Sequence, residues 1–358
     1  MTILWINLAI VFSFAISARY FSTPVLATGL PAAIRPNKLL IFGTIGTLAV
    51  ISGLRSNIGD TFNYRNIFVD NDFTWEYVLS EKDIGFGIFQ MILKNYISQD
   101  PQIMIFSAAL ITNLLIILVL YKYSRLIEIS TYVYITGGLF LVSMNGIRQL
   151  LAAAIAFTAL KFLIEGNFIR YAFIVVFASF FHQSALILLP IYFLVRFKAW
   201  SKATIALIIL SVIIVVGYEQ FSNLLFSALE DTQYKDYDNF NEGGANIIRV
   251  AVGAAPLFIA YLGREKLKAI FPESDYIVNL SVLGFVFMVI STEQWIFARI
   301  AIYFQLYQLI LISWIVKLFR EKDQKFIYLG IIVCYFIYYY YENVISLNIE
   351  YRSDFLIW

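Results

Sequence analysis

The sequence carries little charge for its length. Of 358 residues only 14% are Asp, Glu, Lys or Arg, against about 25% in an ordinary soluble domain. Hydrophobic residues make up 61% of the chain, and the mean hydropathy is +0.78. Because a soluble core cannot bury that much apolar surface, the composition predicts an integral membrane protein. The net charge of +2 also gives no sign of nucleic-acid binding.

Histidine and cysteine are almost missing, with one of each, His182 and Cys334. A single cysteine excludes an internal disulfide and a cysteine-based metal site. The sequence also lacks the HExxH, Walker, GxSxG and dinucleotide-binding motifs. Asp70-Asn71-Asp72 superficially resembles a metal-binding DxD motif, but two nearby carboxylates are common in a solvated acidic loop. We therefore expect no metal and no cofactor.

Long apolar runs dominate the rest of the chain. At about 20 residues per spanning helix, they predict an all-α polytopic protein with about twelve transmembrane helices in a single integral membrane domain, residues 1–358. Nothing basic precedes the first run and no cleavage pattern follows it, so we interpret it as a span and not a signal peptide. The two runs beside His182 are short, and could form a hairpin or a re-entrant element. The runs cover residues 3–18, 39–54, 103–121, 132–144, 150–163, 172–181, 185–194, 204–218, 247–262, 277–291, 300–316 and 326–341.

The distribution of charge predicts the orientation. With the N-terminus outside, most of the 26 basic residues fall on one side of the membrane, including Arg19, Arg125 and Lys317. This excess is expected of cytoplasmic loops, and the acidic residues gather on the opposite side. Both termini are therefore predicted to lie outside.

Two outer segments are longer than a connection requires. Residues 55–100 contain an amphipathic stretch, residues 84–97, in which apolar residues recur at helical spacing: Phe86, Phe89, Ile92, Leu93 and Tyr96. We expect this helix to lie on the membrane surface or over a cavity. Residues 219–246 are polar and acidic and contain two consecutive glycines near their end, a composition typical of a mobile flap.

Five outer arginines lie at predicted helix edges or in the C-terminal tail. Arginine binds phosphate through two parallel hydrogen bonds and keeps its charge in a partly dry site. Several arginines that converge would suit a pyrophosphate. Alternatively, each one extends to the membrane interface or pairs with an acidic loop residue. The five are Arg55, Arg148, Arg249, Arg299 and Arg352.

Two residues are candidates for a general base. His182 falls at an outer helix edge, and with an unperturbed pKa of about 6.5 a histidine can accept a hydroxyl proton. Its alternative role is to cap a hairpin together with Ser184. Asp60 lies five residues after Arg55, which could orient it, and its alternative role is a salt bridge that holds the loop.

Short segments along nearly the whole chain resemble EpsG-like proteins, the Wzy-type polysaccharide polymerases, in order and spacing. The family has an Arg…Gly-x-Asp…Tyr stretch, an Asn-x-x-Arg-Gln turn, a His-x-Ser element, a late Arg…Tyr-Phe segment and a similar tail. The matching segments here are Arg55 to Asp60 with Tyr64, Ser143 to Gln149, Phe181 to Ala185, Arg299 to Phe304, and Tyr351 to Phe355.

The resemblance implies polymerisation of undecaprenyl-pyrophosphate-linked oligosaccharide repeat units into exopolysaccharide, capsule or O-antigen. The reaction would occur at the outer face of the bacterial cytoplasmic membrane, with a flippase and a chain-length regulator as partners, and a GT-C-like fold is an expectation. The five arginines would then bind the pyrophosphate, and His182 or Asp60 would act on the acceptor hydroxyl. The implied positioning residues are Asn145, Gln149, Tyr64 and Tyr303.

Other functions remain open from the sequence. A ligase would move finished glycan onto a different acceptor, and it often carries a larger outer loop. A flippase or transporter predicts charged residues in mid-membrane and internal symmetry, neither of which the sequence shows. A non-enzymatic scaffold for a synthase complex would not need the outer arginines.

Overall fold

The computed structural model describes residues 1–24, 34–218 and 244–356. The chain forms two compact units, Met1–Tyr192 with Ile312–Trp358, and Phe193–Leu311. The regular secondary structure of the described residues is helical apart from one two-residue ladder, which pairs β1 (Thr23–Pro24) with β2 (Ile34–Arg35). The all-α prediction is therefore confirmed. Most of the predicted flap, residues 219–246, lies outside the described residues.

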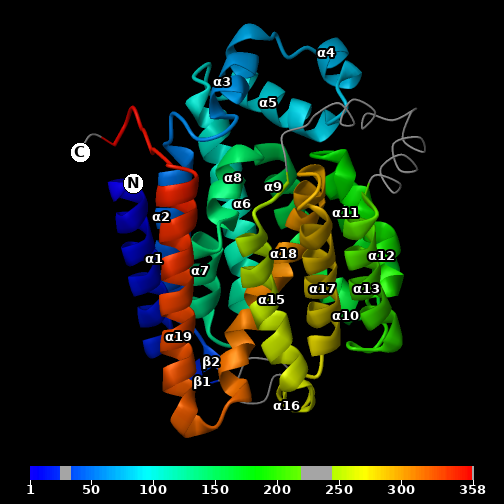
Figure 1. Ribbon diagram of the computed structural model, residues 1–358. Helices are drawn as coiled ribbons and strands as arrows, with labels where there is room; N and C mark the ends of the chain where they lie inside the picture. Colours follow the sequence, from blue (N-terminus) through cyan, green and yellow to red (C-terminus); the bar gives the residue numbers. More distant parts are fainter. Residues whose placement is uncertain (25–33, 219–243, 357–358) are drawn as a thin grey trace. The chain divides into compact units, whose positions relative to one another are not determined.

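The first unit is built on five helices that pack side by side: α1 (Thr2–Tyr20), α2 (Lys38–Gly53), α6 (Gln102–Tyr123), α7 (Ile127–Thr136) and α19 (Glu321–Tyr340). α1 packs against α2 and α7, α2 against α6, and α19 against α7 (Figure 1). On α1 the buried stripe recurs every three or four residues. It comprises Leu4, Asn7, Leu8, Val11, Ala15 and Ala18.

Three short helices lie at one end of this unit, α3 (Thr61–Asp70), α4 (Trp75–Ser80) and α5 (Ile84–Tyr96) (Figure 1). α5 is the predicted amphipathic helix and ends within one residue of the expected boundary. Its Phe86 and Leu93 are buried, whereas Ile92 and Tyr96 are exposed. At the other end, Arg19 in the last turn of α1 forms an ion pair with the fully buried Glu128 of α7.

The middle of this unit consists of short helices separated by tight breaks. α7 and α8 (Leu139–Asn145) meet at a bend of 54°, where Gly138 has φ +93°, a value that favours glycine. α9 (Ile147–Phe157) is almost entirely buried and packs against α6 and α11 (Phe168–Ser179). The chain turns back after α11 into η1 (Gln183–Ile187), which contacts α11 and places His182 at the turn. The described part of this unit also contains α10 (Leu160–Ile164), α12 (Leu188–Leu194), η3 (Val316–Leu318) and the π-helix η4 (Tyr341–Ser346).

The second unit contains α13 (Lys202–Val216), α15 (Ile247–Leu262), α16 (Arg264–Ile270), α17 (Ser274–Ile290) and most of α18 (Ile296–Ile315). α17 is its central helix and packs against α13 and α15. α15 and α16 meet at a bend of 80°. The Asn279 amide donates hydrogen bonds to the carbonyls of Val195 and Phe197, which ties α17 to the segment after α12.

Within the described residues, three helices are long and apolar enough to cross a membrane: α1, α6 and residues Ile296–Leu318. The number rises to five if each of the bent pairs, α7 with α8 and α15 with α16, forms one span. Six further apolar helices have 10–17 residues. The chain is thus a multi-pass membrane protein, and the number of about twelve spans stays a prediction.

Candidate active site

Arg148 is held by two side chains from the helices at the end of the first unit. It lies in the first turn of α9, and its Nη1 is 2.9 Å from Asp83 Oδ2. Its Nε donates to the Tyr64 hydroxyl at 3.3 Å, and its guanidinium carbon lies 5.8 Å from the Tyr64 ring centre. The Arg148 side chain remains 39% exposed. The guanidinium is therefore positioned and still accessible to an anion.

Asp83 connects this arginine to the His182 turn. Its Oδ1 accepts a hydrogen bond from the Gln183 backbone N–H at 3.2 Å. Two residues later, the Gly85 N–H donates to the Phe180 carbonyl at 2.7 Å, and a Cβ on Gly85 would lie 2.7 Å from the Phe180 Cβ. Only glycine permits this close approach. The N-terminus of α5 is thus fixed to the turn after α11.

Burial raises the pKa of Asp83 above its usual value, even though the Arg148 charge and the Gln183 N–H both lower it. Desolvation disfavours the charged carboxylate. The attraction between Asp83 and Arg148 therefore offsets only part of the free-energy cost of removing the Asp83 carboxylate from water.

His182 is oriented by its neighbour Ser184. The Ser184 hydroxyl lies 2.7 Å from the His182 Nδ1, and the His182 backbone is extended at the start of η1. This is the contact expected of a hairpin cap, and it also fixes the plane of the ring, as a general base requires. The next residue, Gln183, donates its backbone N–H to Asp83, so the turn that carries His182 is bound to the carboxylate that holds Arg148.

The Asp60 backbone contacts the Asn145 side chain. The Asp60 N–H donates to Asn145 Oδ1 at 3.0 Å. Gly59 has φ +53°, and a Cβ there would lie 2.2 Å from the same oxygen. The end of α8 therefore fixes the start of α3, which carries Tyr64 three residues beyond its first residue.

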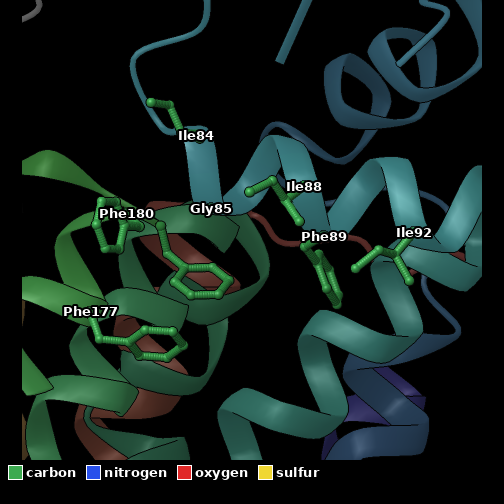
Figure 2. Close-up of a pocket in the computed structure, with 8 residues that line it drawn as sticks. Ile84, Gly85, Ile88, Phe89, Ile92, Phe177 and Phe180 are labelled. Atoms are coloured by element: carbon green, nitrogen blue, oxygen red, sulfur yellow. The ribbon is translucent and has the colours of Figure 1, made fainter. Parts of the chain in front are cut away.

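An apolar groove of about 400 Å³ adjoins the polar cluster. It begins at Ile84 and Gly85, directly after Asp83, and includes Phe181, directly before His182. Figure 2 shows the Phe177 and Phe180 side chains at the end of α11 across from Ile88, Phe89 and Ile92 of α5. No lining residue is charged or polar. The groove can therefore hold a hydrocarbon chain.

The EpsG family model matches residues 38–353. The chain belongs to the EpsG family. The resemblance seen in the short sequence segments is confirmed, and this EpsG-family protein is a membrane protein of the polysaccharide-polymerase type. No curated protein and no solved structure matches the chain.

Arg55, in the first family segment, is buried inside the EpsG-family protein with 1% of its surface exposed. Its Nε donates to the Thr61 hydroxyl at 2.9 Å, its Nη2 to the Met144 carbonyl at 2.6 Å, and its Nη1 to the Ser52 carbonyl. Burial lowers the pKa of Arg55 to about 9, so the group is charged at neutral pH. All three nitrogens are engaged within the protein. The geometry thus favours a structural role for Arg55 over the predicted contact with a pyrophosphate.

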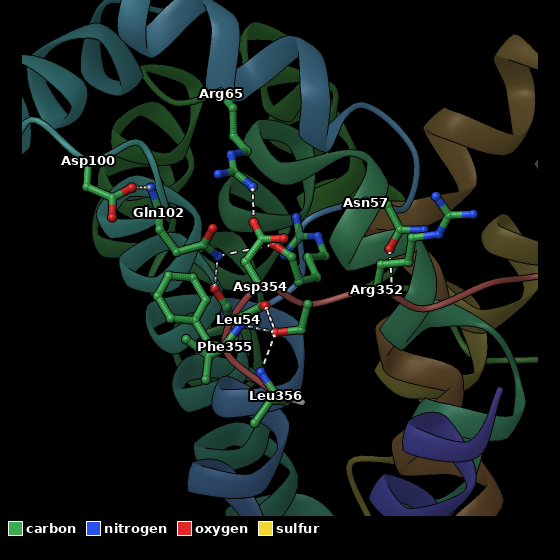
Figure 3. A network of polar contacts seen from close by, with 12 residues as sticks. Leu54, Asn57, Arg65, Asp100, Gln102, Arg352, Asp354, Phe355 and Leu356 are labelled. Carbon is green, nitrogen blue, oxygen red and sulfur yellow. Dashed lines mark hydrogen bonds and ion pairs between the residues drawn. The ribbon is translucent and has the colours of Figure 1, made fainter. Parts of the chain in front are cut away.

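The C-terminal tail, residues 350–356, is bound to the connection between α2 and α3 (Figure 3). The Arg352 backbone N–H donates to Asn57 Oδ1 at 2.7 Å, and the Ser353 hydroxyl donates to the Leu54 carbonyl at 2.5 Å. Arg65 pairs with Asp354 at 3.2 Å. The Arg352 side chain itself is 72% exposed and pairs with Glu350. The tail therefore holds the segment that carries Asp60.

Arg249, Arg299 and Tyr303 belong to the second unit of the EpsG-family protein. The Arg299 guanidinium carbon lies 4.6 Å from the centre of the Trp295 ring, near the start of α18. Tyr303 is 2% exposed, and Arg249 lies in the first turn of α15. The described site therefore assembles Tyr64, Arg148 and the His182 turn within one unit.

Asp83, which joins three of the elements at the site, was not predicted from the sequence. Its signal is positional, because Asp83 is the residue directly before the amphipathic helix 84–97, but several acidic residues of the same loop look equivalent. Gln149, by contrast, was predicted to contact substrate, and its exposed fraction is only 5%. Within the described residues, no three His, Cys, Asp or Glu side chains form a group suited to a metal ion.

Proposed function

We propose that this EpsG-family protein polymerises undecaprenyl-pyrophosphate-linked repeat units at the outer face of the bacterial cytoplasmic membrane. The family supports a polysaccharide polymerase. The observation that carries the finer proposal is that the apolar groove starts at Ile84, directly after Asp83, the residue that pairs with the partly exposed Arg148 side chain. A lipid-linked pyrophosphate needs both a hydrocarbon surface and a cation at its polar end.

The chemistry of the leaving group explains the need for arginine. The acceptor hydroxyl oxygen forms a bond to the anomeric carbon of the donor, and the bond from that carbon to the pyrophosphate oxygen breaks. Undecaprenyl pyrophosphate leaves as a stable anion, so catalysis requires charge compensation more than an acid. Arg148 can supply it through charge-assisted hydrogen bonds, while Asp83 and Tyr64 hold the guanidinium in place.

We assign the acceptor proton to His182. In this step the hydroxyl proton moves to the imidazole as the new glycosidic bond forms, and the negative charge leaves with the pyrophosphate. His182 is favoured over Asp60 because its neighbour Gln183 is bonded to the carboxylate that holds Arg148. A base beside the leaving-group cation is close to the reacting carbon.

Arg249 and Arg299 stay in the proposal as residues of the second unit that would bind the pyrophosphate, and Tyr303 as one that would position the substrate, as the family resemblance implies. Asn145, Gln149 and Arg352 are proposed to act indirectly. Asn145 holds the start of α3, and the tail around Arg352 binds the α2–α3 connection. A flippase that delivers the repeat unit and a chain-length regulator are the proposed partners.

The direct test is to incubate the purified protein with one lipid-linked repeat unit and resolve the products on a gel. A polymerase gives a ladder of increasing length. Transfer of the glycan to a different added acceptor would indicate a ligase, and the absence of any transfer would contradict the proposal. Arg148→Ala should abolish the ladder, whereas Arg170→Ala, which removes an exposed arginine near the start of α11, should leave it intact.

A further inference from the structure

A second cavity, of about 540 Å³, lies between α5 and the segment that leads into α4. It shares Ile88 and Ile92 with the apolar groove, so the two hollows are neighbours along α5. None of its lining residues is charged, and two of them, Thr74 and Asn95, are polar. The lining residues are Phe73, Thr74, Trp75, Ile88, Met91, Ile92, Asn95 and Tyr96.

Two large aromatic side chains in this lining are exposed. Trp75 is 60% exposed and Tyr96 is 81% exposed. A pyranose ring has faces of C–H groups that pack on a flat aromatic ring, and edges of hydroxyls that need hydrogen-bond partners. Trp and Tyr, together with an amide and a hydroxyl, provide both kinds of contact without charge. We propose that this cavity binds the neutral sugars of the glycan, an inference that rests on the proposed function for the glycan's identity.

The walls of the cavity are held in place by buried contacts. Lys94, which precedes Asn95 on α5, donates from Nζ to the carbonyls of Val69 and Asn71, both at 2.9 Å. Its ammonium also lies 5.8 Å from the centre of the Phe73 ring. The Thr74 hydroxyl accepts a hydrogen bond from the Tyr77 N–H and caps α4. A preorganised wall loses little entropy when a ligand binds.

A bilayer is the main competing partner, because Trp and Tyr also gather at membrane interfaces. The surroundings of Trp75 argue against it. Asp72 and Glu76 are exposed on either side of Trp75, and an anionic lipid surface repels carboxylates. A polyprenyl chain, in turn, is better accommodated by the neighbouring groove, which has no polar lining residue.

The cavity extends along α5 from Ile88 to Tyr96, away from the reacting centre. At about 1.5 Å per helical residue, Asn95 is roughly 18 Å along α5 from Asp83. Sugars held at Trp75, Asn95 and Tyr96 are therefore remote from the bond that forms. Binding at this distance would retain the glycan between additions. A variant that loses this binding should therefore have a higher KM and make shorter polymer, while kcat for a single coupling changes little.

The test uses lipid-free oligosaccharides of one to three repeats, prepared by mild acid cleavage of the polysaccharide made by cells that carry this protein. Binding to the full-length protein in nanodiscs is measured by saturation-transfer NMR. We expect the wild-type protein to bind. Trp75→Ala and Tyr96→Ala should each weaken binding about tenfold, as for an aromatic residue that becomes buried at the centre of an interface. Trp75→Phe should keep most of the affinity. Phe62→Ala removes a 68% exposed aromatic of α3 that does not line the cavity, and should change nothing.

Three outcomes would overturn the inference. The wild-type protein does not bind the oligosaccharides, or Phe62→Ala loses as much oligosaccharide binding as Trp75→Ala. In the third, Trp75→Ala loses binding to phosphatidylglycerol vesicles but keeps its binding to the oligosaccharides. The last would identify the aromatics as bilayer anchors. Because the assay contains no lipid-linked donor and no turnover, it is independent of the ladder experiment. If the protein binds the oligosaccharides but makes no ladder, this inference stands and the proposed function fails. If it makes a ladder but does not bind the oligosaccharides, the proposed function stands and this inference fails.

Discussion

The Asp83 carboxylate uses one oxygen for the Arg148 guanidinium, at 2.9 Å, and the other for the Gln183 N–H, at 3.2 Å. This single side chain therefore joins α5, α9 and the His182 turn. Two of the segments that resemble the EpsG family meet through a residue that lies in neither of them.

Asp83→Asn removes the charge but keeps an oxygen that can accept from Gln183. The Arg148 side chain loses its ionic partner, and a shift of about 1 Å in a positioned group can cost on the order of a hundredfold in rate. We expect the initial coupling rate to fall by about tenfold to a hundredfold with a normal yield of folded protein. Glu165→Gln, which removes the exposed partner of Lys161, is the matched control and should leave the rate unchanged.

The stability of the protein should depend on pH through Asp83. Burial raises the pKa of Asp83, so the folded protein binds this proton more tightly than the unfolded chain. Its contribution is present below the unfolded pKa of about 4 and is lost as pH rises through the folded value. The melting temperature of wild type minus that of Asp83→Asn should therefore decrease from about pH 4 upward and then level off. A difference that increases with pH would show that pairing with Arg148 outweighs desolvation.

Gly59→Ala should destabilise the fold. The residue has φ +53°, and the new Cβ would meet Asn145 Oδ1 at 2.2 Å. Strain of this kind costs about 1–3 kcal/mol, which should appear as a lower melting temperature in detergent. Gly46→Ala on α2 is the matched control, because no heavy atom lies within 4 Å of its Cβ position. In a helix that change stabilises by up to about 1 kcal/mol, so a loss in both variants would contradict the account.

Arg55→Lys and Arg148→Lys should fail in different ways. The buried Arg55 uses three nitrogens for three partners, and a lysine cannot reach all of them. Each buried polar group left unpaired costs about 1–3 kcal/mol. We expect little monodisperse Arg55→Lys protein in size-exclusion chromatography. Arg148→Lys should elute normally and couple slowly, since one ammonium cannot reproduce the two-pronged contact with phosphate. If instead Arg148→Lys gave little monodisperse protein and Arg55→Lys eluted normally but coupled slowly, Arg148 would have the structural role and Arg55 the contact with phosphate.

The sequence predicted the elements that depend on local periodicity. The amphipathic stretch 84–97 matches α5 because Phe86 and Leu93 follow the helical repeat and are buried. The predicted spans fit less well, since hydropathy measures apolar content and not helix breaks. The run at residues 132–144 is divided by Gly137 and Gly138 into two helices bent by 54°.

The site was predictable only as a set of residue types. Arg55 and Arg148 look alike in sequence, because both follow or open an apolar run, and only tertiary contacts separate a fully buried guanidinium from an accessible one. Asp83 was missed for the same reason. Its importance comes from partners 65 and 100 positions away in the chain, and no local pattern records them.

The central claim is that Arg148 compensates the charge of a departing lipid pyrophosphate. The most direct measurement is the initial rate of the first coupling, from two lipid-linked repeat units to one dimer, with purified wild type and Arg148→Ala under saturating substrate. Removal of such an electrostatic contact should lower the rate by about a hundredfold to a thousandfold, while Arg170→Ala stays at the wild-type rate. Arg148→Ala coupling at the wild-type rate would contradict the account.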